Sequence, residues 1–202
     1  MVTAEPTFVP SPALARAASW AVEMHAGQVR KATGIPYVSH LFAVAAVAME
    51  YGADEEQTIA ALLHDVVEDT AVTPDELRDR FGDRVAGLVV SCSDSEGEPK
   101  PPWRERKEAY LHHVAEMRAD ALVVTMADKL HNAMSIRRDL RAQGLGMFAR
   151  FTNSDPEDQL WYFEELAAAY RQRAVGQDEL IQLVGELDRV IADVRHQVET
   201  LS

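Results

Sequence analysis

The sequence predicts an all-α fold, a bundle of about eight helices. Apolar residues recur at helical spacing nearly everywhere after residue 11, and several expected helix starts carry a capping residue followed by proline. No run of alternating apolar and polar residues is long enough to predict a strand. Hydrophobic residues make up 47% of the 202, which is enough to fill the core of one domain. We therefore expect helices that bury apolar stripes against one another.

The N-terminal half predicts two helices before residue 53. Residues 1–10 contain two prolines and are expected to form a poorly ordered lead-in. The first helix begins with a proline behind the capping residue Ser11 and runs towards Gly27. The second helix, rich in alanine and valine, follows Ser39 and stops at Gly52.

Two further helix starts follow. Asp54 caps a third predicted helix that continues past His64 to Val67. Residues 73–76 read Thr-Pro-Asp-Glu, a capping box with proline in the first turn, and so begin a fourth helix. This helix should end near Gly82, and another apolar stretch follows it.

The C-terminal half begins with a loop over 93–102, which contains one glycine and three prolines. Four helices should follow it, over 103–117, from 120 towards 144, from 155, and over 178–201. Because no Gly/Ser linker divides the chain, residues 11–202 are expected to form a single domain. The sequence leaves open how its C-terminal helix, within 177–202, packs.

Composition excludes several classes of function. The chain has 33 acidic and 20 basic residues, so its formal net charge is 20 − 33 = −13, which argues against sequence-independent nucleic-acid binding. No apolar run approaches the ~18–20 residues that cross a bilayer, and the N-terminus does not resemble a signal peptide. The single Cys92 excludes an internal disulfide and fits a reducing compartment. We expect a cytoplasmic protein without membrane or nucleic-acid partners. The sequence does not indicate its oligomeric state.

Residues 61–70, Ala-Leu-Leu-His-Asp-Val-Val-Glu-Asp-Thr, place four ionisable groups on an otherwise apolar helix. In a continuous helix His64 would lie beside Glu68, and Asp65 beside Asp69, because residues four apart share a face. Removing four such groups from water is costly without compensation, and a divalent cation would supply it. The alternative is a helix end that frays into solvent, with His64 packed in the core.

Two other segments carry polar groups of interest. Asp128 follows an apolar run long enough to be buried, and a buried aspartate needs a strong partner. Asn132 lies one turn further on. Residues 25–40 combine the basic pair 30–31 with His40 at the start of a helix. Taken alone, each feature is more typical of a structural role than of a binding site: an ion pair for Asp128, solvated surface for the basic pair, and a histidine near a helix cap for His40.

Together the three segments resemble the HD phosphohydrolase superfamily, whose signature is a distant His, an adjacent His-Asp pair and a later Asp. Over about residues 14–170 the chain is similar to the hydrolase domain of RelA/SpoT enzymes and to small alarmone hydrolases of the metazoan SpoT homologue type. The matching segments are 27–31 (Gly-Gln-Val-Arg-Lys), 36–40 (Pro-Tyr-Val-Ser-His), 64–65 (His-Asp), 68–70 (Glu-Asp-Thr) and 127–132 (Ala-Asp-Lys-Leu-His-Asn). The resemblance implies an HD-domain helical bundle.

The resemblance also implies a metal centre. Its ligands would be His40, His64, Asp65 and Asp128. Two imidazoles and two carboxylates suit Mn²⁺ or a related first-row ion better than a metal that prefers thiolates, and Mn²⁺ is the ion that the family implies. Glu68 and Asp69 match the family's catalytic pair, which orients and deprotonates water at the metal.

Substrate contacts are carried over in the same way. In the family Arg30 lies against the guanine ring, and its flat guanidinium suits stacking on a purine. Lys31 and Asn132 are implied contacts to the phosphate or sugar of the substrate. Tyr162 matches a tyrosine that small alarmone hydrolases place near the substrate, with core packing as the alternative.

Two features stay open. The stretch from Lys100 to Lys107 carries four basic residues against Glu105, a local charge of +3, and is either a rim that faces phosphate or a solvated helix start. His25 either supports the site or packs in the core.

The implied activity is metal-dependent hydrolysis of the 3′-pyrophosphate of guanosine tetra- or pentaphosphate to GDP or GTP and pyrophosphate. We expect hydrolase activity only, with this nucleotide as the small-molecule substrate. One alternative is another nucleotide phosphate ester, such as the 2′-phosphate of NADPH, and the other is a non-catalytic nucleotide sensor. Residues 133–135 read Ala-Met-Ser where long RelA/SpoT enzymes have Met-Arg-Thr, so the preferred nucleotide stays open.

Overall fold

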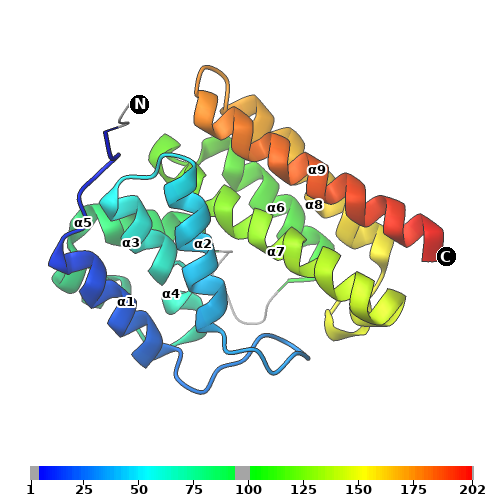
Figure 1. The fold of residues 1–202 in the computed structure, drawn as a ribbon, viewed down its shortest axis with the longest axis horizontal. Helices are drawn as coiled ribbons and strands as arrows, with labels where there is room; N and C mark the ends of the chain where they lie inside the picture. The colour runs from blue at the N-terminus through cyan, green and yellow to red at the C-terminus, as the bar shows by residue number, and fades with distance from the viewer. Residues whose placement is uncertain (1–4, 94–100, 202) are drawn as a thin grey trace. The chain divides into compact units, whose positions relative to one another are not determined.

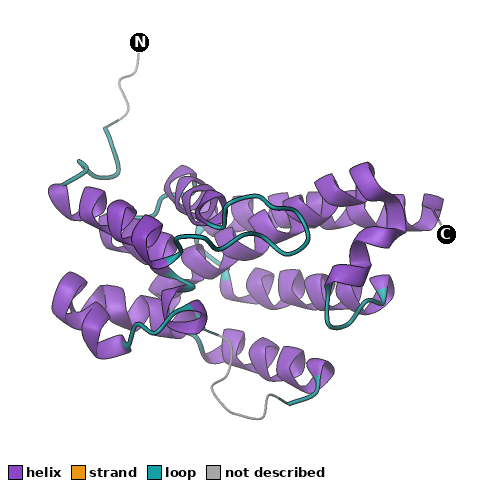
Figure 2. Cartoon of the chain, turned by 90° about the horizontal axis from the view of Figure 1, so that it is seen from below, coloured by secondary structure: helices purple, strands orange, loops and turns teal. Residues whose placement is uncertain are grey.

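The structure, a computed structural model, describes residues 5–93 and 101–201. Within these ranges the chain forms nine α-helices and two 3₁₀ helices, and its only β-type pairing is a single bridge between Val29 and Pro36. Figure 2 shows helices joined by loops throughout the part of the chain that is described. The predicted all-α fold is confirmed. Among the same residues, no helix has the length and apolar character needed to cross a bilayer.

The chain divides into two compact units, which are described one at a time. The first comprises residues 1–93 and 123–127, and the second comprises residues 94–122 and 128–202. The single-domain boundary at 11–202 stays a prediction.

The first unit is built around one short, central helix. Its helices are α1 (Pro12–Met24), α2 (Val38–Glu50), α3 (Glu55–Leu63), α4 (Val66–Asp69) and α5 (Pro74–Cys92). Helix α3 packs against α1, α2 and α5 (Figure 1). Every residue from Thr58 to Leu63 is buried. Because α3 is enclosed on all sides, the residues at its C-terminal end are held by the core of this unit.

Several predicted helix starts are confirmed by their caps. The Ser11 hydroxyl accepts a hydrogen bond from the backbone N–H of Ala13 at 3.1 Å, and Thr73 accepts one from Glu76 at 3.2 Å. Helix α2 differs from the prediction, because it begins at Val38 and has no side-chain cap. Ser39 therefore lies inside the first turn of α2 and does not precede it.

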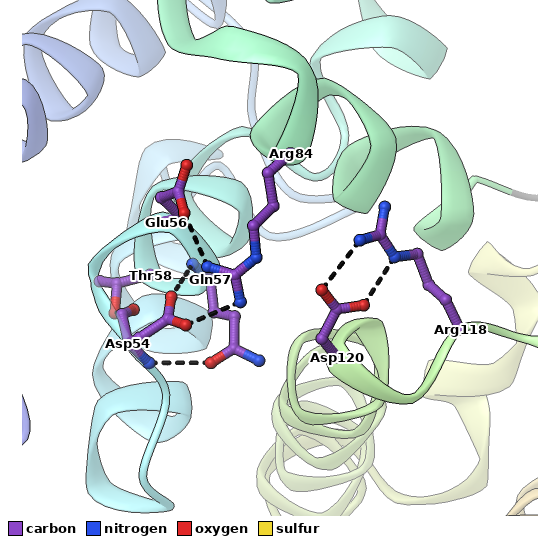
Figure 3. Close-up of polar contacts among 7 residues, drawn as sticks. All are labelled: Asp54, Glu56, Gln57, Thr58, Arg84, Arg118 and Asp120. Carbon is purple, nitrogen blue, oxygen red and sulfur yellow. Dashed lines mark hydrogen bonds and ion pairs between the residues drawn. The ribbon is translucent and has the colours of Figure 1, made fainter.

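An arginine ties α5 to the N-terminus of α3 (Figure 3). The Arg84 guanidinium donates hydrogen bonds of 2.7 Å to Asp54 and of 2.7 Å to Glu56. Burial raises the pKa of Asp54, but hydrogen bonds from Arg84 and the backbone outweigh it, so the pKa lies below its ordinary value. Asp54 also forms a reciprocal capping box with Gln57, with bonds of 2.8 and 2.9 Å.

Helix α5 contains the break that the sequence predicts. Gly82 has φ 88° and ψ 168°, which is not a helical conformation, so α5 consists of two helical segments that meet at this residue. Val85, Ala86, Leu88 and Val89 of the second segment are buried, as expected for the apolar stretch that follows Gly82.

The second unit holds the remaining helices. They are α6 (Trp103–Glu116), η1 (Ala119–Ala121), α7 (Leu122–Gln143), η2 (Gly144–Arg150), α8 (Pro156–Arg173) and α9 (Asp178–Leu201), of which α7 contributes residues 123–127 to the first unit. Helix α8 packs against α6 and α9, and α9 runs alongside α8 (Figure 1). The four predicted helices of this half are confirmed, and the packing of the C-terminal helix is now assigned.

Two arginines of the second unit close helix ends or turns. Arg173 on α8 donates hydrogen bonds to the carbonyl oxygens of Val114 at 2.9 Å and Met117 at 2.6 Å, which lie at the C-terminal end of α6. Arg118 makes a bidentate pair with Asp120, with distances of 2.6 and 2.9 Å (Figure 3). Both contacts satisfy groups next to the turn between α6 and α7.

Candidate metal and catalytic site

Three of the four predicted metal ligands meet in the first unit. His40 lies in the first turn of α2, His64 caps α3, and Asp65 precedes α4. Their ligand atoms all lie within 4.8 Å of one another, and no other such group of histidine, cysteine or carboxylate residues occurs in the described part of the chain. Nε2 of His64 is 3.0 Å from Oδ2 of Asp65, and Nε2 of His40 is 3.6 Å from the same atom.

Two of these residues lie at a break between two helices. The expected continuous helix through Val67 is wrong, because α3 ends at Leu63 and α4 begins at Val66. Consecutive residues of an α-helix point about 100° apart, since the helix has 3.6 residues per turn. At the junction His64 has φ −58° and ψ −30°, and Asp65 has φ −98° and ψ −2°; the side chains of these two residues meet across the turn. Asp69 still follows Asp65 by one helical turn, because its backbone N–H donates to the carbonyl of Asp65 at 2.9 Å, and the expected pairing of His64 with Glu68 stays a prediction.

The orientation of His64 is fixed from behind. Its Nδ1 atom lies 2.8 Å from the carbonyl oxygen of Ala61. A carbonyl oxygen only accepts, so Nδ1 carries the proton and Nε2 is the atom able to bind a metal. His64 is buried, as is His40, and their rings meet edge to face at 5.1 Å between centroids. The histidine therefore presents one defined nitrogen to Asp65.

The donor set fits a divalent first-row cation. It combines two buried imidazoles with one carboxylate and contains no thiol. Imidazole suits zinc, copper, iron and nickel, whereas carboxylate suits magnesium, calcium and manganese, so the mixture is typical of a borderline ion. Cys92 is the only cysteine of the chain and is not part of the cluster.

Asp128, the fourth predicted ligand, belongs to the second unit and lies on α7. It is buried, and both of its carboxylate oxygens have partners: Nζ of Lys129 at 2.7 Å and Nδ2 of Asn132 at 2.6 Å. The expectation that a buried aspartate here needs a strong partner is confirmed. Its role as a metal ligand stays a prediction.

The predicted catalytic pair lies on α4. Glu68 and Asp69 are exposed, and the backbone N–H of Asp69 donates a hydrogen bond of 2.9 Å to the carbonyl of Asp65. Protein atoms around the Asp69 carboxylate displace water and raise its pKa, and the negative charge of Asp65 raises it further. His25, Tyr37 and His64 oppose this rise. A carboxylate with a raised pKa is a better proton acceptor.

The basic pair 30–31 lies in a tight hairpin between α1 and α2. The backbone N–H of Arg30 donates to the carbonyl of Ile35 at 2.8 Å, and the Thr33 hydroxyl donates to the carbonyl of Arg30 at 3.0 Å. Ala32 has a positive φ of 57°, and Gly34 has one of 68°. Lys31 is exposed at the turn. The hairpin's own hydrogen bonds therefore hold the backbone of Arg30 and Lys31 in place.

Tyr162 is buried in the second unit. Its ring packs edge to face against Trp103 at 6.2 Å, and Nζ of Lys107 lies 4.6 Å from its centroid. The expected contact between Tyr162 and substrate stays a prediction beside this packing role.

In the basic stretch from Lys100 to Lys107, Arg104 lies over the ring of Trp161 and pairs with Glu108 at 3.0 Å, which favours a structural role. Lys100 lies outside the described residues.

Residues outside the predicted set complete the first unit's cluster. The hydroxyl of Tyr37 donates a hydrogen bond of 2.5 Å to Oδ2 of Asp65. His25 is buried and contacts Gln28 through Nδ1 at 2.6 Å. Tyr37 stands in the segment 36–40 that identifies His40, so its place in the motif was the available signal. The sequence shows the residue but not the hydroxyl's direction.

Comparison with known proteins assigns the family of this chain. The profile of the HD domain family matches residues 17–156. The chain belongs to the HD domain family. Its match therefore spans the segments that carry the three clustered residues and the predicted catalytic pair, together with the Asp128 segment.

Curated relatives of this HD domain protein carry related names. Proteins named guanosine-3′,5′-bis(diphosphate) 3′-pyrophosphohydrolase are 38% identical over 59% of this chain in Haemophilus influenzae and 51% identical over 60% in Aquifex aeolicus. A zebrafish protein named guanosine-3′,5′-bis(diphosphate) 3′-pyrophosphohydrolase MESH1 is 37% identical over 59%. The aligned region spans 18% and 17% of the two bacterial proteins and 67% of the zebrafish protein.

Solved structures show the same fold. A metazoan orthologue of SpoT, described as hydrolysing ppGpp and acting in starvation responses, aligns with a TM-score of 0.69 and 26% identity over 94% of this chain and 97% of its own. A protein of Listeria monocytogenes EGD-e aligns with a TM-score of 0.68 and 30% identity over 80% of this chain and 99% of its own. The HD-domain bundle predicted from the sequence is confirmed.

Proposed function

We propose that the protein hydrolyses the 3′-pyrophosphate of guanosine tetra- and pentaphosphate, releasing GDP or GTP and pyrophosphate. One observation carries this proposal: His40, His64 and Asp65 converge on one point, one turn before two carboxylates, in a member of the HD domain family. The relatives named as hydrolases of this nucleotide support the choice of substrate. On this proposal the protein is an enzyme with a small nucleotide substrate.

The proposed metal ligands are His40, His64, Asp65 and Asp128, and the proposed ion is Mn²⁺. A divalent cation at such a site supplies Lewis acidity that polarises the phosphoryl group and lowers the pKa of water. The buried imidazoles exclude bulk solvent from one side of the site, which strengthens its electrostatics. The negative charge of the Asp65 carboxylate attracts the cation more strongly than an uncharged donor would.

The exposed carboxylates of α4 have the proposed catalytic roles. Asp69, whose pKa is raised, accepts a proton from the attacking water. Glu68, its neighbour, orients that water. The closed hairpin supports a stacking role for Arg30 and a phosphate contact for Lys31, and Asn132 is a further proposed contact to the nucleotide. A role for Tyr162 at the substrate and a cytoplasmic location stay predictions.

A product assay with a small nucleotide panel tests this proposal. Purified protein is incubated with guanosine tetraphosphate or NADPH, with Mn²⁺ or with excess chelator. We expect pyrophosphate and GDP from the first substrate, only with metal, and no product from Asp65→Asn. Free phosphate from NADPH without pyrophosphate from guanosine tetraphosphate would point to the alternative ester. Tight binding of uncleaved nucleotide in the presence of Mn²⁺ would point to a sensor.

A further inference from the structure

Asp65 is held by a tyrosine that the implied ligand set does not include. The Tyr37 hydroxyl lies 2.5 Å from Oδ2 of Asp65, and because a carboxylate only accepts, the hydroxyl donates. Asp65 is partly exposed and stands in the turn between α3 and α4. A short side chain in such a turn has freedom to rotate, so this bond decides where its oxygens point.

The Tyr37 ring is itself clamped between two histidines. His25 stacks on it with 5.4 Å between centroids and an interplanar angle of 21°, and His40 meets it edge to face at 5.6 Å. Its backbone N–H donates to the carbonyl of Gln28 at 3.0 Å. The hydroxyl therefore approaches Asp65 from a ring that is fixed on both sides.

A second set of contacts, made by His25 and Gln28, reaches the C-terminal end of α4. Nδ1 of His25 lies 2.6 Å from Oε1 of Gln28, and the side-chain amide of Gln28 donates to the carbonyl oxygen of Asp69 at 3.0 Å. Helix α4 has four residues, too few to be stable by itself. Contacts from the segment between α1 and α2 therefore hold both ends of this short helix, Asp65 through Tyr37 and Asp69 through Gln28.

We propose that Tyr37 is a positioning residue of the metal centre, which fixes the Asp65 carboxylate, and that the His25–Gln28 pair positions Asp69. The proposal rests on the proposed function in one respect: it takes Asp65 as a ligand. Residues that hold a ligand from behind change metal affinity by 10–100-fold in other metalloproteins. A packing role alone would make the ring important and the hydroxyl dispensable.

Tyr37→Phe separates these two roles, because phenylalanine keeps the ring between the histidines and removes only the hydroxyl. The probe is Mn²⁺ alone, titrated without nucleotide and followed by the EPR signal of the free ion. We expect about a 10-fold or greater rise in the Kd for Mn²⁺ and an unchanged circular dichroism spectrum. At saturating Mn²⁺ kcat should stay below the wild-type value, because the Tyr37 hydroxyl also hydrogen-bonds the Asp69 carboxylate. Tyr51→Phe, at the C-terminal end of α2, is the matched control and should leave the Kd unchanged.

Gln28→Met tests whether the His25–Gln28 pair positions Asp69. It keeps the length of the side chain and removes the amide that donates to Asp69. We expect the Kd for Mn²⁺ to stay within about threefold of wild type and kcat for pyrophosphate release to fall at saturating Mn²⁺. An unchanged Kd for Mn²⁺ in Tyr37→Phe would overturn the proposal. So would a weaker affinity for Mn²⁺ in a variant that is already unfolded when the metal is removed by chelator. Because the affinity of Tyr37→Phe for Mn²⁺ is measured without nucleotide, a wild-type protein that fails to release pyrophosphate would overturn the proposed function and not the role of Tyr37.

Discussion

The imidazole of His64 hydrogen-bonds backwards to the carbonyl oxygen of Ala61, three residues earlier in the chain, at 2.8 Å. This contact uses a carbonyl at the end of α3, where helical partners are missing. It also turns Nε2 towards Asp65, 3.0 Å away. One bond thus satisfies a carbonyl at the end of α3 and orients Nε2 of His64.

Replacing this imidazole should abolish metal binding. His64→Gln retains polarity but removes the nitrogen that faces Asp65, so we expect no Mn²⁺-induced rise in Tm and loss of pyrophosphate release. In wild type, an ion at 100 times its Kd should stabilise the fold by about 2.7 kcal/mol. Thermal unfolding with Mn²⁺ and with chelator measures this. His112→Gln, on the exposed face of α6, is the control, and an equal rise in Tm in His64→Gln would place the ion elsewhere.

The buried pair on α7 should be important for stability. The side chains of Lys129 and Asp128 are 14% and 10% exposed and lie 2.7 Å apart. Lys129→Met leaves a buried carboxylate without its cation, which costs about 3 kcal/mol or more. Urea unfolding in chelator at pH 7 measures the change in the free energy of unfolding.

The control for this pair is an exposed ion pair in the same unit. Arg189 is 69% exposed and pairs with Glu186 three residues earlier on α9. Arg189→Met should change the free energy of unfolding by less than about 1 kcal/mol. Equal effects of the two methionine substitutions would contradict the buried-pair interpretation.

The Asp139 carboxylate should make stability depend on acid pH. Burial raises the pKa of Asp139, but hydrogen bonds from Arg138 and Arg150 outweigh this and bring the pKa below its ordinary 3.8. The folded state therefore gains stability above pH 3.8, and this gain is lost as the pH falls through the lower, folded pKa. Arg150→Met removes one partner of a pair whose side chains are 10% and 7% exposed.

The expected measurement is a pair of stability curves. At pH 7, Arg150→Met should lower the free energy of unfolding by about 3 kcal/mol. Below pH 3.8 the difference from wild type should narrow, because Asp139 becomes protonated in both proteins. A difference that stays constant from pH 7 to pH 3 would show that Arg150 acts by packing alone.

The break in α5 should depend on glycine. Gly82 has φ 88° and ψ 168°, a region that is almost restricted to glycine, and an added Cβ would meet no atom within 4 Å. Gly82→Ala should therefore cost about 1–3 kcal/mol through backbone strain and not through a clash. Gly146 also has open space, without a positive φ, so Gly146→Ala should change stability by about 1 kcal/mol or less. Similar losses in both variants would argue against strain at Gly82.

Helix starts were predictable because their signals are local. Ser11 and Thr73 cap with their own side chains and are followed by proline, so each start is written within four residues. The break at Gly82 was predictable for the same reason. The turn at 64–65 was not, because neither glycine nor proline marks it and the flanking residues are apolar. It is stabilised by contacts of His64 and Asp65 with groups on other elements, which periodicity does not report.

The sequence indicated which three residues would come together, but not the residues that support them. His40, His64 and Asp65 follow from a resemblance that pairs residue types with order along the chain. Tyr37 and Gln28 act through directions of a hydroxyl and an amide, which depend on how the hairpin folds back. The single bridge between Val29 and Pro36 sets that path, and one residue pair is too short to leave an alternating pattern.

The closed hairpin before α2 also has a consequence for engineering. Two backbone bonds close it: the N–H of Arg30 donates to the carbonyl of Ile35, and the N–H of Tyr37 donates to the carbonyl of Gln28. The tip is thus a self-contained cassette of a few residues, anchored at its base. Sequences transplanted between Val29 and Pro36 should exchange the chemistry offered at the tip while the helical scaffold beneath them is left undisturbed.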